Sequence, residues 1–260
     1  MAGTTYNNLI TNLENNNSDS LLWVLLDPDT ENPDQLCAAA EMAVENGADA
    51  LLVGGSYYER DDFDDSVLAV KEGSAGAVPV FLFPGNHRQV SKYADALLFH
   101  ALISGRNPQY LIGEHLLAAG HVRRLGLETI SMGYLLIESG RVTSVQSVTG
   151  TTPIPREKTE LIATHALAGQ YLGMQLIYLE AGSGGLWPVP DEAISLTKET
   201  IDVPVIIGGG IRGPESAHAA SKAGADVVVV GNVFEQTREP VLIREIAAAV
   251  HGSTKKTVAP

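Results

Sequence analysis

Short apolar runs alternate with longer amphipathic stretches along most of the chain. Eight of these runs, most of them nearly continuous in Val, Ile and Leu, are typical of parallel strands buried on both faces. The predicted strands are Leu21–Asp27, Ala50–Gly54, Val78–Phe83, Ala96–Phe99, Thr129–Ile137, Gln175–Ala181, Val203–Ile207 and Asp226–Val230. The regular alternation predicts an α/β fold with a parallel sheet.

Helical patterns separate and follow these runs. They cover Pro33–Asn46, Asp61–Gly73, His87–Tyr93, Pro108–Leu125, Arg156–Leu172, Asp191–Thr200, Pro214–Ala223 and Pro240–Val250. Four of them begin with proline, which is favoured at the first position of a helix because its fixed φ suits the helix there. Eight strand–helix steps predict a single (β/α)₈ TIM-like barrel, with an open doubly wound sheet as the competing topology.

The chain is predicted to form one domain. Its 260 residues match a barrel of roughly 250 residues, and no linker rich in Pro, Gly or Ser divides it. We assign residues 1–253 to the barrel domain, with an extra N-terminal helix in the first twenty residues. Residues 254–260 are expected to be a disordered tail.

Composition narrows the range of partners. The formal net charge of −14 disfavours binding to nucleic acids and anionic lipid surfaces, although a local site can still hold a small anion. No apolar run reaches the roughly 18 residues of a membrane span, and the N-terminus lacks the pattern of a signal peptide. The single cysteine, Cys37, cannot form an intrachain disulfide. We therefore expect a cytoplasmic protein; the acidity leaves adaptation to salt open.

Acidic residues end two of the predicted strands. Asp27 shares one side of its strand with Trp23, and Glu180 shares one side with Tyr178. Barrel active sites lie at the carboxyl ends of the strands, and an acid that faced the apolar helix layer would be costly. Asp27 is thus either a turn residue or a contact for substrate or for a hard cation such as Mg²⁺. Glu180 is either a solvated loop residue or a base that takes a hydroxyl proton.

Glycine-rich segments follow several strands. Gly208–Gly210 follows the seventh strand and Gly231-Asn232 the eighth, where barrels recurrently bind phosphate. Tyr178–Gly184 adds Ser183 and glycine amides suited to an anion, while Gly54-Gly55-Ser56 is a weaker motif. Glycines that serve only tight turns are the alternative. No zinc motif or nucleophile elbow occurs, so zinc-dependent and serine hydrolysis are disfavoured.

At these motifs the chain closely resembles the geranylgeranylglyceryl phosphate synthase family, which includes heptaprenylglyceryl phosphate synthases. The resemblance extends over residues 21–235. It is carried by LLDPD (25–29), ADALLVGGS (48–56), FPGN (83–86), ADALLF (94–99), SGRNPQYLIGEH (104–115), MGYLLIESG (132–140), YLEAGSG (178–184), GGGIR (208–212) and VGNVFE (230–235). The SGRNP and MGYLL stretches look like the second of the family's two broad groups.

The resemblance implies a Mg²⁺-dependent prenyltransferase. A prenyl diphosphate, geranylgeranyl diphosphate above all, would lose diphosphate, and its C1 would be captured by the 3-hydroxyl of sn-glycerol 1-phosphate. The product would be an ether-lipid precursor. The resemblance also suggests a homo-oligomer, whereas the length of the prenyl chain cannot be read from the sequence.

The family's functional residues transfer by motif. Asp27 and Ser56 would bind Mg²⁺. Glu180 would deprotonate the hydroxyl, and Tyr178 would orient it. Glycerol phosphate would be held by Tyr178, Leu179, Glu180, Ala181, Gly182, Ser183, Gly184, Gly209, Gly210, Gly231 and Asn232.

The chain departs from the family pattern in the first part of the barrel. Many members carry a Lys soon after the first-strand Asp, where this chain has Asp29-Thr30, and one group has Lys where this chain has Leu25. The loop Tyr57–Asp65 is also unusually acidic. The departure at Thr30 leaves open a protein that binds a phospho-ligand without turnover. A flavin or sugar-phosphate barrel is a second alternative, because such barrels share the late phosphate loops.

Overall fold

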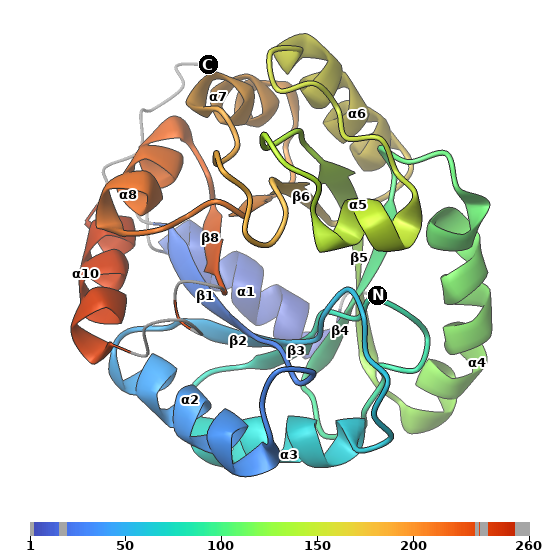
Figure 1. Cartoon of the computed structure of the whole chain (residues 1–260), viewed down its shortest axis with the longest axis vertical. Helices are drawn as coiled ribbons and strands as arrows, with labels where there is room; N and C mark the ends of the chain where they lie inside the picture. The colour runs from blue at the N-terminus through green and yellow to red at the C-terminus, as the bar shows by residue number, and fades with distance from the viewer. Residues whose placement is uncertain (1–2, 16–19, 232–233, 235–238, 253–260) are drawn as a thin grey trace.

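Eight parallel strands form a closed barrel in the computed structural model, which describes residues 3–15, 20–231, 234 and 239–252 (Figure 1). Each strand pairs with the next along the chain, and β8 pairs with β1. The strands are β1 (Leu21–Leu26), β2 (Ala50–Val53), β3 (Val80–Leu82), β4 (Ala96–Leu102), β5 (Glu128–Leu136), β6 (Leu176–Glu180), β7 (Val205–Gly208) and β8 (Val227–Val230). The predicted (β/α)₈ barrel is confirmed.

Helices surround the barrel close to their predicted positions. They are α2 (Pro33–Glu45), α3 (Phe63–Ser74), α4 (Glu114–Leu125), α6 (Thr159–Tyr171), α7 (Asp191–Thr200), α8 (Pro214–Ala223) and α10 (Pro240–His251). A π-helical turn, η1 (Gln109–Gly113), precedes α4. The sequence pattern did not predict the short helix α5 (Ser144–Thr149), whose first turn is capped by the Thr143 side chain.

The helix predicted at His87–Tyr93 is wrong. Between β3 and β4 the chain forms turns and extended segments, so no helix follows β3 in the outer layer (Figure 1). The buried side chain of Gln89 accepts hydrogen bonds from the backbone N–H groups of Gly55 and Gly85, both at 3.2 Å, and donates to Gly55 O at 3.0 Å. These tertiary bonds hold the segment against the loop after β2 in a non-helical path, which local periodicity cannot reveal.

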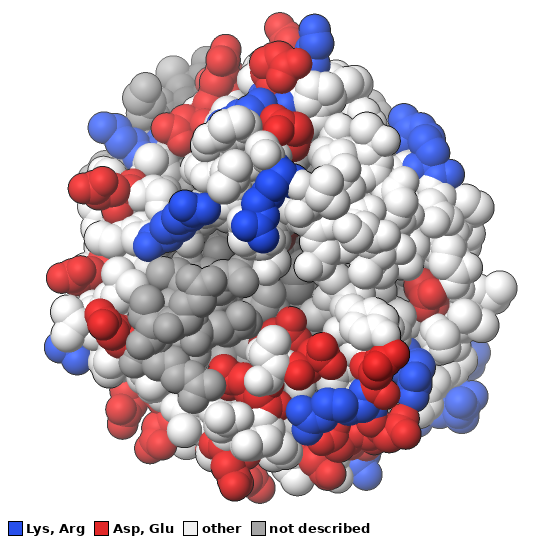
Figure 2. Space-filling model, viewed as in Figure 1, with Lys and Arg blue, Asp and Glu red and all other residues white. Residues whose placement is uncertain are grey.

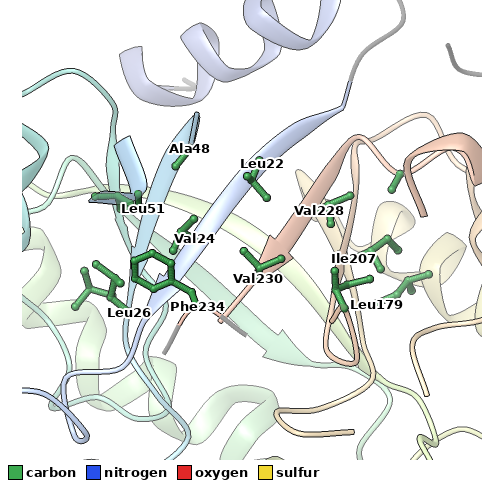
Figure 3. Packing of buried hydrophobic residues seen from close by; sticks show 14 of the residues in the cluster. Leu22, Val24, Leu26, Ala48, Leu51, Leu179, Ile207, Val228, Val230 and Phe234 are labelled. Atoms are coloured by element: carbon green, nitrogen blue, oxygen red, sulfur yellow. The ribbon is translucent and has the colours of Figure 1, made fainter. Parts of the chain in front are cut away.

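Two separate apolar layers stabilise the barrel. Outward-facing side chains such as Leu22, Val24 and Val230 pack beneath the helices (Figure 3). Inward-facing side chains fill the lumen, where the rings of Trp23 and Phe81 stack with centroids 5.0 Å apart. Because side chains alternate along a strand, the lumen positions of β1 and β6 lead directly to the acids that follow or end those strands.

The predicted N-terminal helix is present as α1 (Thr4–Asn15), which lies behind the barrel in Figure 1. Leu9 packs against the lumen cluster from the amino-terminal end of the strands. The Glu128 carboxylate accepts hydrogen bonds from the backbone N–H groups of Thr5 and Tyr6 at 3.0 and 2.8 Å. The helix therefore covers the end opposite the predicted active site. The predicted tail at 254–260 lies outside the described residues.

Among the residues that the structure describes, no helix has the length and apolar character needed to cross a membrane.

Candidate active site

A pocket of about 800 Å³ opens at the carboxyl ends of the strands. It brings together predicted site residues from both halves of the chain, namely Asp27, Ser56, Tyr178, Glu180, Ser183, Gly184, Gly209, Gly210 and Gly231. Leu179 and Ala181 instead point their side chains into the core beneath the helices, so only their backbone can serve the pocket. Asn232 lies outside the described residues.

Glu180 is buried at the inner end of this pocket, with only 6% of its surface exposed. One of its oxygens accepts the backbone N–H of Gly182 at 2.5 Å, and the hydroxyls of Tyr134 and Tyr178 donate to the carboxylate. Burial raises the pKa of Glu180 to about 7, because the loss of hydration outweighs the opposing effect of these hydrogen bonds. The carboxylate is thus balanced between its protonated and ionised forms near neutral pH, as a general base requires.

The glycines after β7 allow the loop to approach this carboxylate. Gly209 and Gly210 have φ values of 78° and 72°, in the left-handed region where side chains are strained. A Cβ atom on Gly209 would overlap a carboxylate oxygen of Glu180 and the amide of Gly182. The loops after β6 and β7 therefore meet at Glu180 with their backbones in contact, and Gly210 and Gly231 line the pocket beside it.

Aromatic rings form the wall of the pocket next to Glu180. The Tyr178 ring stacks on Tyr134 and on Phe83, with centroid distances of 5.4 and 5.3 Å, and His100 lies 5.1 Å from Phe83. Burial lowers the pKa of His100 to about 4, so this ring is neutral at physiological pH. Sequence reasoning gave Tyr134, Phe83 and His100 no role. Only the register of β5 against β6, which places Tyr134 beside Tyr178, reveals the contact with Glu180.

An apolar groove extends the pocket between β4 and α4. Its described lining includes Val90, Leu97, Phe99, His115 and Ala118. Leu97 and Phe99 lie on the outer face of β4, which a helix between β3 and β4 would cover in a regular (β/α)₈ barrel. The missing helix therefore leaves a long apolar surface that runs from the aromatic wall toward the outside.

Asp27 lies at the opposite side of the mouth, just after β1. A Cβ atom on Gly55 would come within 2.8 Å of both carboxylate oxygens, so the glycine leaves room for the acid, and Ser56 follows it at the pocket wall. Burial raises the pKa of Asp27 to about 6. No group of three His, Cys, Asp or Glu residues within the described ranges is placed to hold a metal ion. Oxygen ligands from one carboxylate and one hydroxyl fit Mg²⁺ that completes its shell with water and substrate phosphate.

The acidic loop after β2 has a structural explanation. Arg60 forms an ion pair with Asp62 inside that loop. The same guanidinium donates hydrogen bonds to the carbonyl oxygens of Pro28 and Glu31 at 3.1 and 3.0 Å. The loop is therefore attached to the segment that carries Asp27, and one of its acidic residues, Asp62, pairs with the arginine that makes this attachment.

The two sides of the barrel mouth differ in charge. Figure 2 shows basic side chains on the rim near the loops after β6 and β7, whereas acidic side chains predominate, with basic ones among them, on the rim near the loops after β1 and β2. Among the described residues that line the pocket, the basic ones are Arg141, in the loop after β5, and Arg212, in the loop after β7. An anion is thus favoured on the glycine-rich side and a cation on the Asp27 side.

The family of the chain follows from a match to the PcrB family model, which covers residues 17–250. The chain belongs to the PcrB family. It is 50% identical to the geranylgeranylglyceryl phosphate synthase of Thermococcus kodakarensis over 228 residues, which cover 87% of this chain and 89% of the relative. It is 44% identical to the enzyme of the same name from Chitinophaga pinensis over 230 residues, or 88% and 90% of the two chains.

Solved structures agree with this assignment. Wild-type GGGPS from Thermoplasma volcanium superposes with a TM-score of 0.90 at 33% identity, covering 98% of this chain and 100% of that one. The (S)-3-O-geranylgeranylglyceryl phosphate synthase from Thermoplasma acidophilum, in complex with sn-glycerol-1-phosphate, gives 0.89 at 31% identity over 96% and 99% of the two chains. The predicted family is confirmed, and the protein is an enzyme, a prenyltransferase. Its cytoplasmic location and its homo-oligomeric state stay predictions.

Proposed function

We propose that this enzyme transfers a prenyl group, geranylgeranyl above all, from its diphosphate to the 3-hydroxyl of sn-glycerol 1-phosphate in a Mg²⁺-dependent reaction. The observation that carries the proposal is the place of Glu180, a buried carboxylate with a pKa of about 7 between glycine-rich loops and an apolar groove. Its relative from Thermoplasma acidophilum is described with sn-glycerol-1-phosphate as substrate. Each part of the pocket would then bind one group of the two substrates.

The glycine-rich side of the mouth suits the phosphate of the glycerol substrate. Gly209 and Gly210 bring backbone close to the pocket through positive φ values, and Gly184 and Gly231 line the same side. Backbone N–H groups in such loops bind phosphate in many barrels. With its phosphate held there, the glycerol moiety reaches toward the carboxylate of Glu180.

Glu180 is proposed as the base, with Tyr134 and Tyr178 holding its carboxylate in place. The bond between C1 of the prenyl group and the diphosphate oxygen breaks, and its electron pair leaves with the diphosphate. The 3-hydroxyl oxygen of the glycerol substrate forms the new bond to C1, and its proton passes to the carboxylate of Glu180. Orientation of hydroxyl and carbon in one site supplies much of the rate.

Asp27 and Ser56 are proposed to hold Mg²⁺, which offsets the charge on the departing diphosphate when it is bound. The prenyl chain then extends from the mouth into the apolar groove between β4 and α4. The aromatic wall formed by Phe83 and the two tyrosines lies between these two places. It excludes water from C1, which would otherwise compete with the glycerol hydroxyl.

Incubation with radiolabelled sn-glycerol 1-phosphate, geranylgeranyl diphosphate and Mg²⁺ tests the proposal. We expect a labelled, solvent-extractable lipid, no product after chelation of the metal with EDTA, and a mass that identifies the chain transferred. Competition among several prenyl diphosphates then measures the preferred length. Absence of labelled lipid with every prenyl diphosphate tried would refute the proposed function.

A further inference from the structure

Arg141 lies at the mouth of the pocket, in the loop after β5. It lines the pocket and makes no hydrogen bond or ion pair with any residue that the structure describes. Arg212, on the same side, instead donates to the backbone oxygen of Gly185 at 3.0 Å, which fixes its side chain. Arg141 is thus a positively charged residue of the pocket whose guanidinium N–H groups can donate hydrogen bonds to a ligand.

The backbone that carries Arg141 is held on both sides. The carbonyl of Ser139 accepts the backbone N–H of Leu186 at 2.9 Å, and Ser139 is buried. Beyond Arg141, the buried Thr143 packs against Gly182, where a Cβ atom would overlap its side chain. The loop after β5 is therefore packed onto the loop after β6, so the arginine starts from a defined position although its side chain is exposed.

The guanidinium of Arg141 lies directly over Gly184. A Cβ atom on Gly184 would be 3.0 Å from one terminal nitrogen of Arg141 and 3.4 Å from Cζ. Gly184 has a φ of 71°, a conformation that side chains rarely adopt. The absence of a side chain at this position thus lets the guanidinium approach the loop that follows Glu180.

The negative charge of the molecule disfavours the binding of a phosphate unless a nearby cation offsets it. The chain has a formal net charge of −14, and the pocket contains the carboxyl groups of Asp27 and Glu180. A phosphate monoester that enters this field needs local positive charge, which neutral amides supply only in part. Guanidinium binds a phosphate through two parallel N–H donors, and such charge-assisted hydrogen bonds are the strong ones.

We propose that Arg141 binds the phosphate of the glycerol substrate and determines the affinity for it. The proposal rests on the proposed function for the identity of this ligand. Arg141 lies beside Gly184 on the glycine-rich side of the mouth, in the loop after β5, and β5 is the strand opposite β1 in the eight-stranded barrel. The prenyl diphosphate, assigned to the Asp27 side, is not expected to depend on this arginine.

Steady-state kinetics of Arg141→Ala test the proposal, with Arg141→Lys as the conservative variant. Arg124→Ala, which removes an equal charge from the exposed side of α4, is the matched control. We expect the KM for sn-glycerol 1-phosphate to rise about 10- to 100-fold in Arg141→Ala, the value of a charge-assisted hydrogen bond. The kcat and the KM for prenyl diphosphate should stay within about threefold, and Arg141→Lys should recover part of the lost affinity.

Calorimetric titration of each variant with sn-glycerol 1-phosphate alone separates this inference from the proposed reaction. Weaker binding by Arg141→Ala than by wild type and Arg124→Ala supports the inference even if no prenylated lipid forms. Equal binding by all three proteins overturns it, whether or not the wild type is active. A rise confined to the KM for prenyl diphosphate also overturns it, since the arginine would then serve the other substrate.

Discussion

Replacement of Glu180 by glutamine tests the proposed base through both activity and stability. The substitution keeps the size of the side chain and removes the charge. In the folded protein, burial raises the pKa of this carboxyl from 4.5 to about 7. Since one pKa unit corresponds to about 1.4 kcal/mol, ionising Glu180 in the folded protein costs about 3 kcal/mol more than in the unfolded chain.

The sign of the pH dependence follows from this shift. Between pH 4.5 and 7 the folded state binds the Glu180 proton more tightly than the unfolded state does. Stability of the wild type therefore falls as pH rises through this window and levels off above about pH 7. Glu180→Gln lacks this loss, so its stability gain over wild type should be largest at pH 8, up to about 3 kcal/mol, and small near pH 4.

The activity of the wild type should rise with pH over the range in which its stability falls. The ionised carboxylate accepts the hydroxyl proton, so kcat/KM of the wild type should rise with pH up to about 7 and then level off. Glu180→Gln should lose about 10²- to 10⁴-fold in kcat, which is the usual contribution of a general base, while calorimetry should detect largely unchanged binding of glycerol phosphate.

Denaturant unfolding at several pH values and initial rates over the same range provide the measurements. Glu157→Gln, at an exposed position, is the control and should match wild type in both. Wild-type turnover in Glu180→Gln would remove this residue from the mechanism. A stability difference that does not change with pH would refute the argument from burial.

Three further substitutions address the surroundings of the site. Tyr134→Phe removes a hydrogen bond that lowers the pKa of Glu180, so the rising limb of the pH–rate profile should move to higher pH; an unmoved limb would mean that the hydroxyl does not act on the base. Asp27→Asn should reduce turnover about 100-fold or more, because metal charge stabilisation is worth several kcal/mol; a Mg²⁺ titration of the initial rate should show weaker activation, and unchanged activation would contradict the assignment. Gly209→Ala forces a side chain into a φ of 78° and against the Glu180 carboxylate, so thermal unfolding should show a loss of about 1–3 kcal/mol together with lost activity. Gly213→Ala is its control, because this extended residue has open space around the Cβ position; equal stability of the two variants would argue against the strain.

The sequence by itself was sufficient for the plan of the barrel. Parallel strands covered on both faces are apolar nearly throughout, so runs such as 203–207 and 227–230 could be recognised without tertiary information. Residues at the carboxyl ends of such strands meet at one end of the barrel. The meeting of Asp27 with Glu180 and the late glycines in one pocket was thus predictable from their places along the chain.

Tertiary structure decided which residues act on one another, because those contacts join segments far apart in the sequence. The Gln89 side chain, bound to the loop after β2, replaced the predicted helix at 87–93 with turns, and so left the groove beside β4 open. The pairing of β5 with β6 brought Tyr134 to Glu180, and burial then raised the pKa of that carboxyl. Arg141 reached the pocket through the packing of its loop onto the next one. Periodicity records which face of an element is buried, whereas register, side-chain hydrogen bonds and desolvation depend on the neighbours that the closed barrel brings together.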